Sequence, residues 1–146
     1  MLRPSSILTL FLMSVSLSTA AAQQPTTLNQ CTGTHQADLN ACAKAQLNHS
    51  NKQLLQIYQE IIKNYRHNPL LLNRLKESQK AWSHYRDAQL RLLYPQPSDY
   101  ATVFPLCSAQ YLTKLTQERI TVLKQWLLGK PEGDVCAGSI RIIRRI

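Results

Sequence analysis

The hydrophobic positions between Thr34 and Pro69 follow the repeat of a helix that buries one face. Apolar residues recur there at three- and four-residue intervals, at Leu39, Cys42, Leu47, Leu54, Ile57, Tyr58, Ile61 and Tyr65. Thr34 is a suitable N-cap for this helix. We expect the helix to end at Asn68, because a residue that precedes a proline is displaced from the helical backbone conformation.

A second helix is predicted over about 70–93, and Pro69 suits its first turn. Its inner face is formed by Leu71, Leu75, Trp82, Tyr85 and Leu92. The Tyr-Pro-Gln-Pro-Ser-Asp segment at 94–99 then breaks the helical pattern.

A third helix follows this break. It starts either at Ser98 with a kink at Pro105, or with Pro105 in its first turn. Gly129 is expected to end it in a left-handed conformation, with Pro131 beyond. The inner stripe of this helix is Leu112, Leu115, Arg119, Val122, Leu123 and Trp126.

No alternating pattern of useful length indicates a strand, so the predicted fold class is all-α. Three helices joined by short turns must run antiparallel, which gives a three-helix bundle with up-down-up topology. Residues 34–128 form this single helical domain. Residues 23–33 are expected to be a loose N-terminal segment, and residues 129–146 a basic C-terminal tail.

Residues 1–22 have the three parts of a cleavable signal peptide. Arg3 supplies the positive start, residues 7–17 form an uncharged apolar stretch, and small residues at 18–22 suit signal peptidase. The apolar stretch is shorter than the roughly 20 residues of a membrane span, and Leu28-Asn29-Gln30 before Cys31 is not a lipobox. We expect cleavage after Ala22, with Ala20 as a second choice. The mature protein would be periplasmic or secreted, without lipid and without a transmembrane segment.

All four cysteines, Cys31, Cys42, Cys107 and Cys136, lie beyond the expected cleavage site. An even number of cysteines in a small exported domain indicates two disulfides that staple the bundle. A metal site is the competing interpretation. The chain has neither a C-x-x-C pair nor an H-x-x-x-H spacing, so no metal or other cofactor is expected.

The charge of the chain narrows the choice of partner. Without Arg3, the formal net charge falls from +9 to +8. This excess favours an anionic partner such as an acidic lipid, lipopolysaccharide, a wall polymer or an acidic protein, although solubility alone also explains scattered charge. Nucleic acid is not an expected partner, because the chain carries an export signal and no nucleic-acid-binding motif.

Enzyme activity is not expected either. The histidines at positions 35, 49, 67 and 84 are scattered, with no spacing that would give a nucleophile or a metal its partners. No close pair of carboxylates is recognisable on one helix face, as glycosidase chemistry requires. A binding protein is therefore the expected class.

The stretch from Gln79 to Asp87 differs from an ordinary amphipathic helix. Gln79, Trp82 and Arg86 are spaced i, i+3 and i+7, so they share one stripe, where Leu, Ile and Val are usual. Antiparallel packing would place Arg119 near Gln79 and Trp82. A guanidinium over an indole contributes roughly 0.5–2 kcal/mol, so Trp82 is expected to be a core residue.

Arg86 and Asp87 are sequence neighbours, and we expect them to point in different directions and to serve different partners. Asp87 lies near the end of its helix, where the helix dipole disfavours a negative charge. A compensating Lys or Arg is therefore expected nearby. The functional alternative is that this pair forms a contact surface for a partner.

Three segments resemble the LprI-type family of small exported bacterial proteins, whose domain is described as lysozyme-inhibitor-like. Residues 79–87, with Tyr85 in the aromatic position, resemble the family's Q-x-x-W-x-x-(Y/F)-R-D pattern. Cys107 followed by Thr116, Arg119 and Leu123 is similar to C…T-x-x-R-x-x-x-L, and residues 31–58 are similar to an opening C…C…Y. The chain departs from the family in having Leu90 where a cysteine is usual, and in its additional Cys136.

The resemblance implies an all-helical exported domain and one named activity, the inhibition of lysozyme. It also implies a disulfide pairing: since some relatives carry only the first two cysteines, Cys31 and Cys42 are expected to pair with each other. Cys107 would then pair with Cys136, in place of the partner lost at Leu90.

This pairing would fix the position of the tail. Residues 129–136 would run back along the bundle and bring the basic tail to the 94–99 loop. One positive patch for an anionic partner would result, formed by Arg86, Arg91, Arg141, Arg144 and Arg145.

Two functional hypotheses remain from the sequence. In the first, the domain inhibits a lysozyme or another wall-degrading (muralytic) hydrolase through an exposed loop or edge. In the second, it is an envelope-associated module that binds anionic wall or lipopolysaccharide polymers without inhibiting an enzyme. The positive charge argues against basic animal-type lysozymes as targets, because like charges slow encounter and oppose binding.

Overall fold

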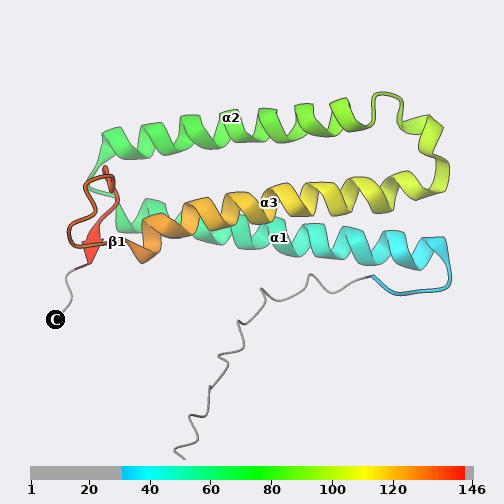
Figure 1. Ribbon diagram of the computed structural model, residues 1–146, viewed down its shortest axis with the longest axis horizontal. Helices are drawn as coiled ribbons and strands as arrows, with labels where there is room; N and C mark the ends of the chain where they lie inside the picture. Colours follow the sequence, from blue (N-terminus) through cyan, green and yellow to red (C-terminus); the bar gives the residue numbers. More distant parts are fainter. Residues whose placement is uncertain (1–30, 144–146) are drawn as a thin grey trace, which may run out of the picture.

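The computed structural model describes residues 31–143, and these are mostly helical, as the sequence predicts. Helix α1 spans Gln36–Asn64, α2 spans Pro69–Leu93 and α3 spans Phe104–Leu128. A 3-10 helix, η1 (Pro97–Val103), lies between α2 and α3. The three long helices run in alternating directions (Figure 1). The expected signal peptide at 1–22 lies outside the described residues.

The turn between α1 and α2 differs from the expected one. Asn68 does not end α1, which already stops at Asn64. Asn68 instead caps α2, because its side-chain oxygen accepts a hydrogen bond of 3.0 Å from the backbone N–H of Leu71. Pro69 occupies the first turn of α2, as predicted. The predicted N-cap at Thr34 is wrong, since the residue before α1 is His35 and its side chain makes no capping bond.

The start of α3 follows the second of the two predicted alternatives. Pro105 lies in its first turn, where the missing N–H has no intrahelical partner to lose. The residues from Pro97 to Val103 form the separate η1 instead of a kinked extension of α3.

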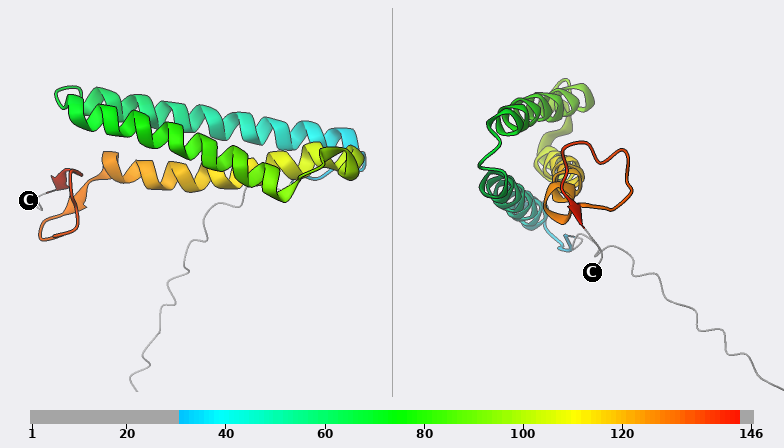
Figure 2. Two further views of the ribbon diagram at one scale, coloured as in Figure 1. Left: turned by 90° about the horizontal axis from the view of Figure 1, so that it is seen from above. Right: turned by 90° about the vertical axis from the view of Figure 1, so that its left-hand side faces the viewer.

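Among the described helices, α1 and α3 pack against each other most extensively (Figures 1 and 2). Small side chains are buried along this contact, namely Ala43, Ser50, Ala109, Thr113 and Thr116. The hydroxyls of both threonines donate to carbonyl oxygens one turn earlier in α3, at 2.7 and 2.8 Å. The Ser50 hydroxyl accepts a hydrogen bond of 2.8 Å from Gln117. Polar groups are therefore buried here with their hydrogen bonds made, as a dry interface requires.

The main hydrophobic cluster lies toward the end where α1 meets α2. It consists of Leu54, Ile57, Ile61, Leu75, Ile120 and Leu123. Trp82 and Trp126 are partly buried against it, together with Tyr58, Tyr65 and Leu127. Helix α2 contributes one member, Leu75, whereas α1 and α3 contribute the other five.

Part of the predicted inner face of α2 is exposed. Leu71 and Leu75 are buried as expected and Trp82 is partly buried, but Tyr85 is 53% exposed and Leu92 is 74% exposed. Both lie in the half of α2 that extends beyond the main cluster, where it has few buried apolar neighbours. On α3, Val122 was expected inside and is 55% exposed.

Residues 129–143 fold at the end of α3 and form two very short strands that the sequence did not predict. Strand β1 (Lys130–Pro131) pairs in parallel with β2 (Ile142–Ile143). Gly129 ends α3 with φ 83°, as predicted. A Cβ at this position would lie 2.9 Å from the carbonyl oxygen of Arg141, so both the backbone conformation and the close approach of the tail require glycine.

One of the two predicted disulfides is present. Cys31 and Cys42 are bonded, whereas Cys107 and Cys136 are both free thiols. The predicted Cys107–Cys136 bond is wrong because α3 continues without a break to Leu128. That length of helix rises by roughly 30 Å from Cys107, and the tail stays at its far end (Figure 1). A single disulfide therefore crosslinks the chain, within one end of the molecule.

Ile61 and Ile62 give a matched test of the core. Ile61 is fully buried and Ile62 is 37% exposed on the adjacent face of α1. Ile61→Ala should lower the free energy of unfolding by ~2–5 kcal/mol, because it leaves a cavity in the cluster. Ile62→Ala should change it by ~0.5 kcal/mol or less. Urea denaturation measures both, and equal effects would contradict the assigned core.

The thiols give a second test. Without reductant, the unfolded mature protein should react with a thiol reagent at two cysteines per molecule. In the folded protein the exposed Cys136 should react faster than the partly buried Cys107. Peptide mapping without reduction provides the check, since a linked Cys107–Cys136 fragment would contradict the arrangement described here.

Candidate functional site

Trp82 is the centre of a cluster of polar side chains between α2 and α3. The guanidinium carbon of Arg119 lies 5.9 Å from the centroid of the Trp82 ring, and that of Arg86 lies 5.2 Å from it. Arg119 also donates from Nε to the Gln79 side-chain oxygen at 3.1 Å, and from Nη2 to the Ser78 hydroxyl at 2.9 Å. The sequence-based placement of Arg119 beside Gln79 and Trp82 is thus confirmed.

Arg86 and Asp87 do not serve different partners, contrary to expectation. Nε and Nη2 of Arg86 both donate to one oxygen of Asp87, at 3.1 and 3.0 Å. The side chains leave the helix in different directions, but the long arginine stem allows the guanidinium to bend back to its neighbour. Arg86 is therefore the compensating base that was expected near Asp87.

The remaining family-motif residues lie in different surroundings. Thr116 is fully buried in the contact between α1 and α3, and Tyr85 is exposed on α2. The motif residues thus do not form one ligand site. Most of them hold α2 and α3 in place.

Arg119 has no anionic partner in the described part of the chain. The two ion pairs among residues 31–143 are Arg74–Glu77 and Arg86–Asp87, and neither includes it. Burial lowers the pKa of Arg119 below its ordinary value, but an arginine remains protonated at neutral pH. The site therefore holds a partly buried positive charge whose hydrogen-bond partners at Ser78 and Gln79 are neutral.

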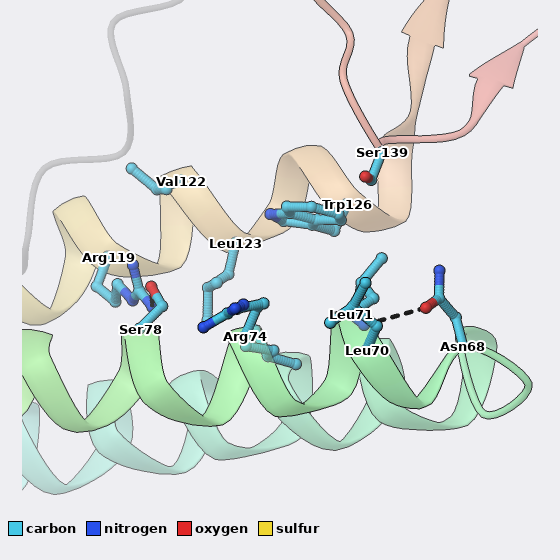
Figure 3. A pocket seen from close by; sticks show the side chains of 11 residues that line it. Asn68, Leu70, Leu71, Arg74, Ser78, Arg119, Val122, Leu123, Trp126 and Ser139 are labelled. Carbon is cyan, nitrogen blue, oxygen red and sulfur yellow. Dashed lines mark hydrogen bonds between the residues drawn. The ribbon is translucent and has the colours of Figure 1, made fainter.

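A groove opens beside Arg119, between the first half of α2 and the second half of α3. Figure 3 shows side chains of both helices pointing into it, with Ser139 of the tail at one end. The volume is about 560 Å³. The apolar lining residues are Leu70, Leu71, Leu75, Val122, Leu123 and Trp126, and the polar ones are Asn68, Arg74, Ser78, Arg119 and Ser139.

This groove was not predicted from the sequence, although the chain carries a signal for it. Leucine occupies positions 70, 71 and 72, and Val122 is followed by Leu123. Consecutive apolar residues widen the apolar face of a helix beyond the single stripe that packing against one neighbour needs. What the pattern cannot give is the distance between the two helices.

The loop end of the molecule, residues 91–104, is held in a defined shape. Tyr94 makes edge-to-face contacts with Tyr100 and Phe104, at centroid distances of 4.9 and 5.4 Å. The side-chain amide of Asn40 donates to the carbonyl oxygen of Thr102 at 3.1 Å, which ties the loop to α1. Burial, with the nearby Cys107 thiol as a second cause, raises the pKa of Tyr94 above its ordinary value.

The surface of this loop end is unusually apolar. Leu92, Leu93, Tyr100 and Val103 are all large, hydrophobic and exposed, and Arg91 lies exposed beside them. Ala101, next to Tyr100, has φ 43° and ψ −128°. Residues other than glycine adopt such a conformation only at a cost of about 1–3 kcal/mol, so the surrounding contacts must enforce it.

The predicted positive patch is not assembled. Arg91 lies at the loop end, whereas Arg141 lies at the opposite end of α3 (Figure 1). There the Arg141 side chain donates to the carbonyl oxygen of Leu127, and its backbone N–H donates to the Tyr65 hydroxyl at 3.4 Å. Arg86 is engaged with Asp87 and Trp82. Arg144 and Arg145 lie outside the described residues.

Two further observations limit the chemistry of residues 31–143. No helix in this part of the chain is long and apolar enough to cross a membrane. The same residues contain no group of three or more His, Cys, Asp or Glu side chains that could hold a metal ion.

The contact between Trp82 and Arg119 can be measured with a double-mutant cycle. Trp82→Leu and Arg119→Met should each destabilise the protein, and the double variant should lose less than the sum. The expected coupling is roughly 0.5–2 kcal/mol by urea denaturation. Replacing Arg119→Met with Lys124→Met, at an exposed position on the same helix, should give no coupling. A coupling of zero in the first cycle would contradict the cluster.

Comparison with known proteins agrees with the motifs and the helical fold. A family model described as "Lysozyme inhibitor LprI" matches residues 19–123, which is well over half of the chain. The match includes α1, α2, the loop end and α3 as far as Leu123, and it leaves the tail outside. Searches of the curated proteins and of the solved structures give no match. From the span of the family match, we conclude that the chain belongs to the LprI lysozyme inhibitor family.

Proposed function

We propose that this protein is an exported helical binding protein that inhibits a lysozyme or another muralytic hydrolase. The observation that carries the proposal is the family match over residues 19–123, because the family is named for inhibition and not for an enzymatic activity. Export is part of the proposal. It is supported by the predicted signal peptide at 1–22 and by the Cys31–Cys42 disulfide, a bond typical of oxidising compartments.

The loop end is the surface that best fits contact with an enzyme. An inhibitor gains affinity when its contact segment is already ordered, because less conformational entropy is lost on binding. Pro95 and Pro97 restrict the backbone of this loop, and the Tyr94 contacts and the Asn40 hydrogen bond hold it further. The strained backbone at Ala101 is also a feature that clusters at functional segments.

The side chains exposed at the loop end have the composition of a binding centre. Exposed apolar residues that gather in one place mark interaction sites, and tyrosine and arginine are enriched among the residues that dominate binding energy. Tyr100 and Arg91 supply both types here. The loop end lies within the part of the chain that the family model covers.

Charge favours a particular kind of target. Glycoside hydrolases of the cell wall carry a pair of carboxylates in the cleft, and an exposed arginine such as Arg91 is a suitable partner for one of them. The whole chain is basic, with a formal net charge of +9. A muralytic enzyme with an acidic surface is therefore a better target than a basic animal-type lysozyme.

The inhibition of purified muralytic enzymes tests this proposal. Clearing of a cell-wall suspension would be measured with the mature protein present, for acidic and basic enzymes, at low and high salt. Inhibition should be stronger for acidic enzymes. Tyr100→Ala and Arg91→Ala should each raise the inhibition constant about tenfold or more, equivalent to ~1.4 kcal/mol or more.

Matched controls lie away from the loop end. Tyr85→Ala removes an exposed tyrosine from the side of α2, and Arg66→Ala removes an exposed arginine at the opposite end of the molecule. Both variants should inhibit like the unmodified protein. Equal losses in the control variants would overturn the proposed surface. Salt-sensitive retention on anionic wall polymer, with no inhibition of any enzyme, would overturn the function in favour of an envelope-associated module.

A further inference from the structure

We propose that the groove between α2 and α3 binds a medium-chain fatty acid, with its carboxylate at Arg119 and its acyl chain along the apolar lining. This inference goes beyond the proposed inhibition, since the groove lies in the half of the molecule away from the loop end. The inference rests on the shape of the groove, on its apolar and polar lining residues and on the charge of Arg119.

The groove has the dimensions and the lining of a site for an acyl chain. A volume of about 560 Å³ falls within the range of roughly 300–1,000 Å³ that is typical of small-molecule sites. It follows α2 from Asn68 to Ser78, a helical rise of about 15 Å. Leu71, Leu75 and Leu123 form a buried apolar floor, so an elongated apolar ligand would be removed from water along its length.

The end of the groove at Arg119 suits a negatively charged group. Arg119 lies there beside Ser78, as Figure 3 shows, while Leu71 and Trp126 lie farther along the groove. Its hydrogen bonds go to the neutral oxygens of Ser78 and Gln79. No described residue forms an ion pair with Arg119. A partly buried cation with only neutral partners is incompletely compensated, and a carboxylate can accept two N–H bonds from a guanidinium. Arg74, also on the groove, is already paired with Glu77 at 2.8 Å.

The rim leaves the groove accessible from outside. Leu70 and Val122 are large apolar residues on opposite helices, and both are exposed. A ligand with an apolar chain would cover them, which removes further hydrophobic surface from water.

Both tryptophans of the chain are placed to report binding. Trp126 lines the groove, and Trp82 contacts Arg119. The chain contains no other tryptophan, so its tryptophan fluorescence comes from these two residues. Titration of the mature protein with decanoate, below its micellar concentration, should give a saturable change in tryptophan fluorescence with one site per protein. 1-Decanol, which has the chain without the charge, should bind at least about tenfold more weakly. Acetate, which has the charge without the chain, should give no change.

Variants separate the proposed site from non-specific adsorption. Arg119→Gln should weaken decanoate at least about tenfold and remove its advantage over 1-decanol, while Arg119→Lys should retain part of that advantage. Because changes at Arg119 also affect folding, Val122→Asp provides an independent test at the exposed rim. The introduced carboxylate should repel the carboxylate of decanoate and abolish its binding. Thr121→Asp adds the same charge to the neighbouring exposed position outside the groove and should leave binding unchanged.

Three outcomes would overturn the proposal. The first is equal binding of decanoate and 1-decanol, and the second is equal effects of Val122→Asp and Thr121→Asp. The third is a stable dimer by sedimentation that Val122→Asp dissociates, because a second copy of the chain would then occupy the groove.

Discussion

The close approach of α1 and α3 is the constraint on which the rest of the structure depends. It is possible because alanine, serine and threonine are buried along the contact, where larger side chains would separate the helices. The hydroxyl of Thr116 is satisfied within its own helix and that of Ser50 by Gln117 across the contact, so their burial leaves no unpaired polar group. Once this pair of helices is fixed, the position of α2 is decided by the side chains of α1 and α3 that are not already used in the contact between them.

Helix α2 is held by larger side chains, and this explains where the family motif lies. Leu75 reaches the main cluster, and Trp82 reaches Arg119 on α3. Long side chains keep two helices farther apart than alanine and serine do, so the residues that secure α2 also create the space beside it. The motif residues therefore chiefly hold α2 against α3 and set the distance between these helices. The surfaces that are open to a partner lie next to the motif and at the loop end.

The sequence was informative wherever a local rule decides the structure. The three helices follow from the spacing of apolar residues, Pro69 and Gly129 mark a start and an end, and Arg119 faces Trp82 because antiparallel helices align their middles. The predictions from the sequence were wrong or missing where a feature depends on the distances between helices. The exposure of Leu92 reflects how far the core extends along α2. The free Cys107 reflects an unbroken α3, which pairing by analogy with relatives could not reveal. The groove depends on the separation of two helices, which no periodicity encodes.

The position of the disulfide has a consequence for how the molecule reaches its folded state. Cys31 and Cys42 are 11 residues apart, so the bond closes a small loop at the start of α1 and joins no helix to another. Such a loop lowers the entropy of the unfolded chain by an amount worth about 3 kcal/mol, and the bond itself is not part of any contact between helices. The covalent connectivity thus imposes no order in which the helices must pack, and without the bond only the segment around Cys31 would lose its covalent tether.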